Sequence, residues 1–246
     1  MPAELLPWIL LAGVTVVAAA VHAALGFGSG PLTVPVLLTV VEPTIAVVVA
    51  VLIGMAVNVM QLLTERRRPH VAVRRLLPLW LAALPGCVAG AVLAGTIPAT
   101  ALAMIVALLL ILSATTLFVH PASAIRLPPP VMALAGLVTG ASAALTGIFG
   151  PLLGVVLVAA GERGATLRDG LGASFLVIGT AAVIASLAVT GASSAFAVAA
   201  VLLLPAGAGY VLGRRGARRL APRTQRRAVL LAVLTGAGFA LARAAA

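Results

Sequence analysis

The sequence predicts an all-α polytopic membrane protein, because its composition and the length of its apolar stretches both point to a lipid environment. Of the 246 residues, 63% are hydrophobic and only 9% are charged, whereas a soluble domain carries about 25% charged residues. So few charges cannot cover a globular surface, which argues against a soluble enzyme. Apolar stretches of about 20 residues, the length of a membrane-crossing helix, recur along the chain.

The apolar stretches are of two kinds, unbroken and interrupted. Six are unbroken and of roughly spanning length: 44–63, 76–95, 98–119, 170–189, 195–213 and 228–242. Two others, 5–41 and 131–161, contain a break rich in glycine and proline. Each break is followed by an apolar piece of about ten residues, which as a helix would extend about 15 Å, half-way across a bilayer.

The charge distribution predicts the topology. The net charge of +11 arises from 16 arginines, no lysine and five acidic residues. Nearly all of the arginines lie between apolar stretches, which is typical of cytoplasmic loops beside anionic lipid headgroups and argues against nucleic-acid binding. If each interrupted segment crossed the membrane once, the arginine-rich loops 64–75 and 214–227 would lie on opposite sides. If each is a hairpin that returns to its starting side, only Arg243 lies outside, so the positive-inside rule favours hairpins, with both termini extracytoplasmic.

The hairpin interpretation predicts an inverted-topology repeat. Each half has one hairpin, re-entrant or broken, and three transmembrane helices, and this odd number of crossings inverts the second half relative to the first. Residues match at an offset of 120: Gly30-Pro31-Leu32 with Gly150-Pro151-Leu152, Leu84-Pro85 with Leu204-Pro205, and Glu42 with Glu162. We therefore expect a first membrane repeat at 1–119, a cytoplasmic linker at 120–130 and a second repeat at 131–246.

The two breaks have the features of an anion site. Backbone groups cannot remain unpaired in lipid, so the breaks should face an internal cavity. Pro31 and Pro151 suit the first turn of a helix, with Ser29 or Gly30 as the N-cap of one half-helix and Gly150 as that of the other. Two half-helices entering from opposite faces would present free N–H groups and partial positive charge to a small anion near the midplane. Alternatively, the glycines are packing notches and the prolines are kinks.

Few other polar residues lie within the apolar segments. Asn58 and Gln61 share one face of helix 44–63, where they would donate to an anion, cap the hairpin or form interhelical hydrogen bonds. His22 is the one titratable residue well inside a predicted helix, and it is either a neutral packing histidine or proton-linked. The candidate substrate-binding residues are Gly26, Gly28, Ser29, Gly30, Asn58, Gln61, Thr146, Gly147 and Gly150.

The sequence contains no recognisable motif for catalysis, a metal or a cofactor. It lacks an HExxH zinc motif and a Walker-type phosphate loop. Its single cysteine, Cys87, excludes an intrachain disulfide and a multi-cysteine metal site, and we expect it to be a small core residue. The protein is therefore expected to be neither an enzyme nor a cofactor carrier.

Two glycine-rich motifs, together with the Leu-Pro pairs at 84–85 and 204–205, suggest a family. They are Gly26-Phe27-Gly28-Ser29-Gly30-Pro31-Leu32-Thr33-Val34-Pro35 and Thr146-Gly147-Ile148-Phe149-Gly150-Pro151. With these motifs the sequence resembles the TauE/SafE family of sulfite exporters and related organosulfur-anion permeases. The resemblance implies a carrier in the bacterial inner membrane for small anions such as sulfite, sulfoacetate or other organosulfonates.

We expect a secondary transporter that exports a small sulfur-containing anion by alternating access. An inside-negative potential drives an anion outward by about 2.3 kcal/mol per charge and 100 mV, so export needs no coupling carboxylate. The expected partners are the anionic substrate and anionic membrane lipids at the arginine-rich loops. The alternative is a membrane-embedded scaffold or assembly factor without transport activity. In such a protein the two breaks would pack against other residues, with no water-accessible cavity between them.

Overall fold

The computed structural model is all-helical over the residues that it describes, which are 2–65, 68–98, 127–217 and five positions between 100 and 108. Most of the predicted segment 98–119, most of the linker 120–130, the whole of segment 228–242 and Arg243 lie outside these residues. The described helices are α1 (Pro2–Leu25), α2 (Ser29–Val40), α3 (Pro43–Thr64), α4 (Val73–Thr96), α6 (Pro129–Thr146), α7 (Gly150–Ala159), α8 (Gly164–Thr190) and α9 (Ala195–Ala217). No β-strand occurs in this part of the chain.

Six of the described helices are long and apolar enough to cross a membrane, so the chain is a multi-pass membrane protein, as predicted. These six helices do not coincide with the six unbroken apolar stretches of the sequence. The first arms of the two interrupted segments, α1 and α6, are themselves of spanning length, with 24 and 18 residues. The second arms are short, with 12 residues in α2 and 10 in α7.

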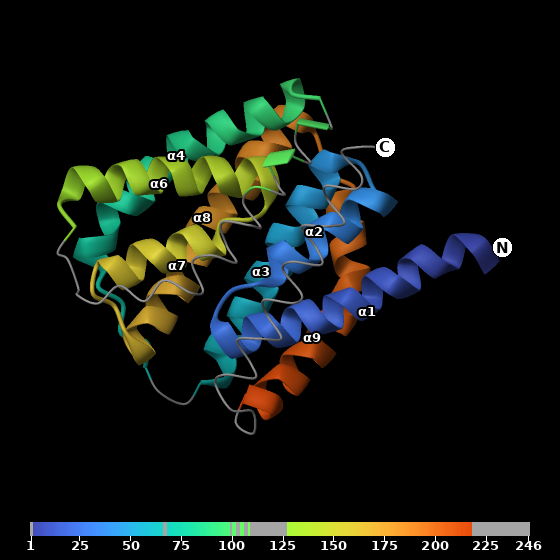
Figure 1. Ribbon diagram of the computed structural model, residues 1–246, viewed down its shortest axis with the longest axis horizontal. Helices are drawn as coiled ribbons and strands as arrows, with labels where there is room; N and C mark the ends of the chain where they lie inside the picture. Colours follow the sequence, from blue (N-terminus) through green and yellow to red (C-terminus); the bar gives the residue numbers. More distant parts are fainter. Residues whose placement is uncertain are drawn as a thin grey trace.

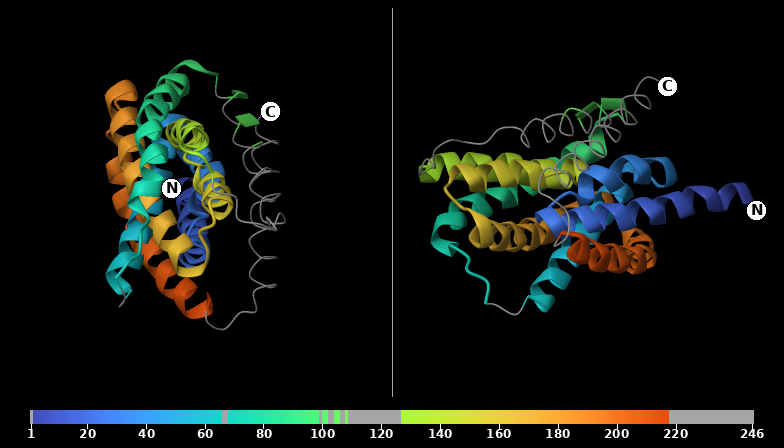
Figure 2. Two further views of the ribbon diagram at one scale, coloured as in Figure 1. Left: turned by 90° about the vertical axis from the view of Figure 1, so that its left-hand side faces the viewer. Right: turned by 60° about the horizontal axis from the view of Figure 1, so that its bottom comes forward.

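The chain reverses direction at both breaks. α2 runs back beside α1, and α7 runs back beside α6, as the two orientations of Figures 1 and 2 show. In Figure 1 the α1–α2 hairpin enters from the right and the α6–α7 hairpin from the left, so that the two turns approach each other near the centre. In the first turn, Gly26 and Gly28 have φ angles of 84° and 123°, which glycine adopts without the steric cost of a side chain.

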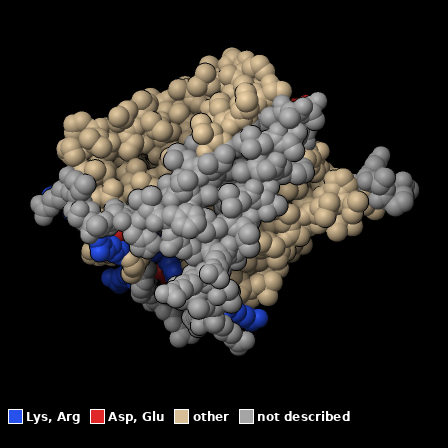
Figure 3. All heavy atoms as spheres, viewed as in Figure 1, with Lys and Arg blue, Asp and Glu red and all other residues tan. Residues whose placement is uncertain are grey.

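The described arginines of the loops 64–75, 162–169 and 214–217 lie at one end of the molecule. Arg214 at the end of α9 donates to the carbonyl group of Thr64 at the end of α3, over 3.1 Å. Arg168 near the start of α8 lies 3.7 Å from Glu65. The arginines visible in Figure 3 lie along the left and lower edges of the bundle. A single crossing by each interrupted segment would have separated Thr64 and Arg214 by the thickness of the membrane, so their contact agrees with the hairpin course.

Glycines bring two pairs of helices into close contact. A Cβ added to any of four glycines between α4 and α6 would overlap a carbonyl group of the facing helix. These glycines are Gly86 and Gly90 of α4 and Gly136 and Gly140 of α6. Gly209 and Gly213 of α9 lie in the same way against the carbonyl groups of Val16 and Ala20 in α1. This four-residue spacing of small residues lets helices approach closely in a membrane, where side-chain packing replaces the hydrophobic effect.

Candidate functional site

The two breaks touch each other in the interior of the bundle. A Cβ added to Gly30 would overlap the carbonyl oxygen of Gly147, and one added to Gly150 would lie 2.8 Å from the Cβ of Phe27. Gly26 and Gly28 are buried beside them. The structure thus brings together all five predicted glycines, and Gly30 and Gly150 serve as packing notches between the two turns.

The caps of both half-helices differ by one residue from the sequence prediction. The N-cap of α2 is Gly28, rather than Ser29 or Gly30, and the N-cap of α7 is Phe149, rather than Gly150. The prediction used side-chain type, but here the non-helical backbone of Gly28, with φ of 123°, sets the boundary. Neither cap makes a side-chain hydrogen bond. The hydroxyl of Ser29 is therefore not used for capping.

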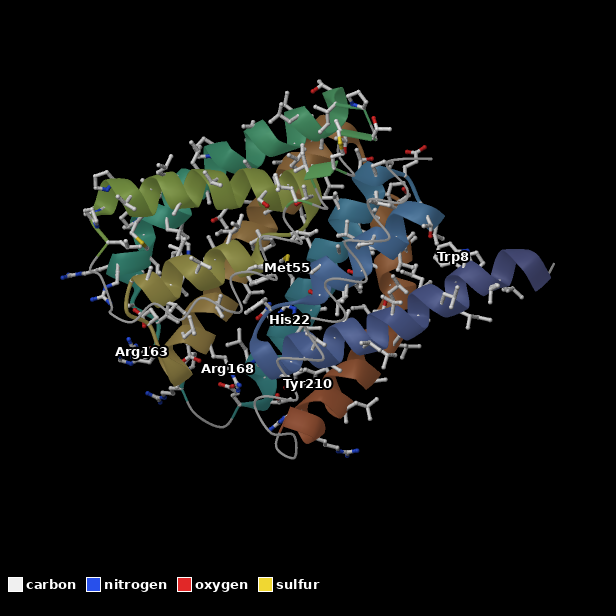
Figure 4. All side chains as sticks on the ribbon, in the orientation of Figure 1. Trp8, His22, Met55, Arg163, Arg168 and Tyr210 are labelled. Carbon is white, nitrogen blue, oxygen red and sulfur yellow. The ribbon has the colours of Figure 1, made fainter. Side chains whose placement is uncertain are left out.

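His22 is buried and is hydrogen-bonded through both ring nitrogens. Its Nδ1 lies 2.8 Å from Oγ of Ser29, and its Nε2 lies 3.0 Å from Nδ2 of Asn58. The Asn58 amide also donates to the carbonyl group of Gly54, over 2.9 Å. The three predicted residues His22, Ser29 and Asn58 therefore form one network that joins α1, α2 and α3, and Figure 4 shows His22 near the centre of the bundle.

Two aromatic rings that the sequence analysis missed complete this cluster. Phe175 of α8 packs edge-on against His22, with ring centroids 5.2 Å apart, and lies 4.3 Å from the ring of Phe149. Phe149 belongs to the second break, so the aromatic contacts connect the two breaks through α8. An apolar phenylalanine inside an apolar helix has no local signal, and only the packing of α8 reveals its position.

Hydrogen bonds from hydroxyl groups at the second break stabilise its turn. Thr146 donates to the carbonyl group of Ser142 over 2.8 Å and accepts from the backbone N–H of Ile148 over 3.1 Å. Ser142, which the sequence analysis did not single out, donates to the carbonyl group of Ile148 over 2.6 Å. The predicted binding residue Thr146 therefore has its hydroxyl occupied within the turn.

Gln61 stands apart from this network. Its side chain is 8% exposed, and its Nε2 has no hydrogen-bond partner among the described residues. It lies three residues after Asn58, on the same face of α3. The structure thus leaves one predicted donor buried and without a described partner, one helical turn beyond Asn58.

Other polar residues of the apolar segments have structural partners. The indole of Trp80 donates to Ser174 over 2.8 Å, which ties α4 to α8. Cys87 is 1% exposed and lies in the core, as predicted. Trp8 is 38% exposed on the outer part of α1, away from the breaks (Figure 4).

Residues 11–241 match the protein-family model described as sulfite exporter TauE/SafE. The matched region includes both breaks and the His22 cluster. No curated protein and no solved structure matches the chain.

Proposed function

The chain belongs to the TauE/SafE sulfite exporter family, and on that premise we propose that it exports a small sulfur-containing anion as a secondary carrier of the bacterial inner membrane. The family consists of membrane transporters of sulfur anions, not of enzymes. The proposed substrates are sulfite, sulfoacetate or another organosulfonate, and the proposed mechanism is alternating access.

The pattern of helix neighbours supports an inverted repeat. With an offset of 120, the helices α1, α2, α3 and α4 correspond to α6, α7, α8 and α9. α4 packs against α6 and α8, and α9 packs against α1 and α3. The equivalent helices α4 and α9 therefore each contact the corresponding pair in the other half, as a pseudo-two-fold relationship requires. We assign the repeats to 1–119 and 131–246, with 120–130 as a cytoplasmic linker.

The proposed substrate site lies where the two breaks meet, and the juxtaposition of Gly30 and Gly147 is the observation that carries it. The first-turn N–H groups of α2 and α7 have no carbonyl group of their own helix to bind, and each half-helix adds partial positive charge there. Ser29 adds a hydroxyl group and Gln61 adds an unused amide. Asn58 contributes through its hydrogen bond to His22. The remaining positions of the proposed site are Gly26, Gly28, Thr146 and Gly150.

The contact between the breaks corresponds to a closed state of the proposed carrier. The α1–α2 and α6–α7 hairpins meet through glycine backbone at Gly30 and Gly147, while Gly150 faces the Cβ of Phe27. Such a junction can separate with little repacking, and movement of one repeat against the other is the usual form of alternating access in inverted-repeat carriers. We propose that a substrate enters when the hairpins move apart.

The membrane potential and the positions of the acidic residues support outward transport. The five acidic residues, Glu4, Glu42, Glu65, Glu162 and Asp169, lie near helix ends or in loops. An inside-negative potential favours anion exit by about 2.3 kcal/mol per charge and 100 mV, so export proceeds without a coupling acid. We further propose that the arginine-rich end faces the cytoplasm and its anionic lipids, which places both termini outside.

Reconstituted vesicles test this function. Proteoliposomes are loaded with sulfite, sulfoacetate, taurine or sulfate, and release is followed at imposed membrane potentials. We expect protein-dependent release of a sulfur anion that increases with an outward-driving potential. Absence of protein-dependent flux for every anion would contradict the proposal and favour the scaffold alternative.

A further inference from the structure

A polar stripe on α3 leads from the arginine-rich end of the molecule toward the two breaks. Asn58 and Gln61 are the only polar residues of this helix within the range 45–63. At 3.6 residues per turn, they lie within about 60° of each other and of Gly54 and Glu65 around the helix axis. α3 therefore presents its few interior polar groups, and the carboxylate at its C-terminal end, on a single face.

This face of α3 lies against α8. A Cβ added to Gly172 of α8 would lie 3.5 Å from Oδ1 of Asn58. About two turns nearer the arginine-rich end, Oε1 of Glu65 lies 3.7 Å from Nη1 of Arg168. Gln61 belongs to the same stripe, between these two contacts. The polar residues of α3 thus follow its contact with α8, from an exposed arginine to the residue that binds His22.

Gln61 is the member of this stripe that has a buried group to offer. Its side chain is 8% exposed, and its Nε2 has no hydrogen-bond partner within the described part of the chain. A buried donor without a partner is costly unless a ligand accepts from it. An anion that moves from Arg168 toward the breaks would pass this amide one turn after it leaves Glu65.

The ion pair of Arg168 with Glu65 is loose enough to be exchanged. Its 3.7 Å separation exceeds the roughly 2.7–2.9 Å of a charge-assisted hydrogen bond. The two side chains are 45% and 21% exposed, and exposed pairs of this kind contribute little to stability. A sulfur oxyanion offers the guanidinium the same kind of oxygen as the carboxylate does. It can therefore replace Glu65 on Arg168 at small cost.

We infer that Arg168 captures the transported anion, that Glu65 occupies its guanidinium until the anion displaces it, and that Gln61 is the next donor inward. This inference rests on the proposed function and adds an entry position to its site. In Figure 4 Arg168 lies below His22, toward the arginine-rich end, which is the end proposed to face the cytoplasm. An exported anion would therefore meet Arg168 before it reaches the breaks.

Opposite effects of the two charged residues on KM are the first test. Initial efflux from proteoliposomes is measured against the internal concentration of the sulfur anion that the wild-type protein carries fastest. Arg168→Gln should raise the KM by about three- to tenfold, because the capturing cation is lost. Glu65→Gln should lower it by about two- to fivefold, because the competing carboxylate is lost. The double variant should have the KM of Arg168→Gln alone.

A matched pair controls for charge at this end of the molecule. Arg75 and Glu162 also form an arginine–carboxylate contact across the two halves, with an arginine side chain that is 46% exposed, but neither residue belongs to the α3 stripe. Arg75→Gln and Glu162→Gln should leave the KM within about twofold of the wild-type value. If Arg168 and Glu65 only tie α3 to α8, their two variants will shift the KM in the same direction or not at all, and the inference is wrong.

Gln61→Leu tests the inner position. If the amide accepts no role in binding, replacing an unpaired buried donor with an apolar side chain should leave the KM unchanged and keep or raise the melting temperature. If the amide binds the anion, the KM should rise by about tenfold although the protein remains as stable as the wild type. A wild-type KM in this variant would remove Gln61 from the entry position and overturn the inference.

Binding without transport separates this inference from the proposed function. Sulfite, sulfoacetate or sulfate is added to the detergent-solubilised protein, and the shift of its melting temperature reports binding. We expect a shift that is reduced in Arg168→Gln and Gln61→Leu and increased in Glu65→Gln. This pattern without any flux would contradict export and support the entry position. Flux with equal KM values in all variants would support export and overturn the entry position, as would the absence of a shift in the wild-type protein with every anion.

Discussion

Arg75 of α4 holds Glu162, just beyond the C-terminal end of the half-helix α7, at 3.3 Å. The same guanidinium nitrogen lies 3.3 Å from the carbonyl oxygen of Ala160. A cation at the carbonyl end of a helix also interacts favourably with the helix dipole. α4 thus fastens the second arm of the second hairpin at the arginine-rich end of the molecule.

Arg75→Gln and Glu162→Gln should each change stability only slightly. The Arg75 side chain is 46% exposed and that of Glu162 is 9% exposed, so solvent screens the pair from the arginine side, and pairs with an exposed partner contribute about 1 kcal/mol or less. A double-mutant cycle on thermal unfolding in detergent measures the coupling between the two side chains. A coupling above about 2 kcal/mol would mean that the pair is far better shielded than its exposure indicates.

Gly30→Ala should destabilise the protein and abolish flux. The added Cβ would overlap the carbonyl oxygen of Gly147, and overpacking a buried contact of this kind costs about 1–3 kcal/mol. The melting temperature and the efflux rate in proteoliposomes report the two effects. Gly13→Ala in the same hairpin is the control, because nothing lies within 4 Å of its added Cβ, and it should leave both values unchanged or raise stability. Wild-type flux through the Gly30→Ala protein would show that the junction of the two breaks is not part of the transport path.

Ser29→Ala should weaken substrate binding more than it lowers the maximal rate. A hydrogen bond to a charged ligand contributes about 1.5–3 kcal/mol, so the KM for the exported anion should rise by roughly tenfold or more. Thr33→Val on the same helix removes a buried hydroxyl that bonds only to the carbonyl group of Ser29, and its KM should stay within about threefold of the wild-type value. Equal KM values for the two variants would argue against contact between Ser29 and the substrate.

Gly140→Ala should disrupt the close packing of α4 against α6. Its Cβ would overlap the carbonyl group of Ala83, so the helices must move apart, at a cost of about 1–3 kcal/mol. Gly207→Ala in α9 has no atom within 4 Å of the new Cβ and should be neutral or slightly stabilising. The melting temperatures of the two variants are compared. An equal decrease in both would show that the α4–α6 contact does not cause the loss of stability.

Much of the fold could be predicted because the signals are local. A glycine- and proline-rich break ends a helix wherever it occurs, so the two interruptions and the short helices that follow were predicted close to their positions in the structure. The N-caps at Gly28 and Phe149 were missed by one residue, since the backbone dihedral angles set the helix boundary. The packing of α4 against α6 and α8, and of α9 against α1 and α3, depends on tertiary structure, and no local pattern specifies it.

The candidate site was predicted less completely. Ser29, Asn58 and His22 were singled out because polar residues are rare in apolar segments. Their connection was not predicted, because it needs α1, α2 and α3 in one particular packing. Phe175 and Ser142 carry no local signal of their roles, and Thr146 proved to bond within its own turn.

The sequence by itself determined three properties of this chain: that it is a membrane protein, at which residues its helices are interrupted, and that its charged residues lie in loops. It could do so because hydrophobicity, glycine and proline act over a few neighbouring residues. Only the tertiary structure decided that the two breaks touch and that His22 is hydrogen-bonded to both Ser29 and Asn58. Those properties depend on distances of about 3 Å between residues far apart in the chain, and such distances follow from packing rather than from local sequence.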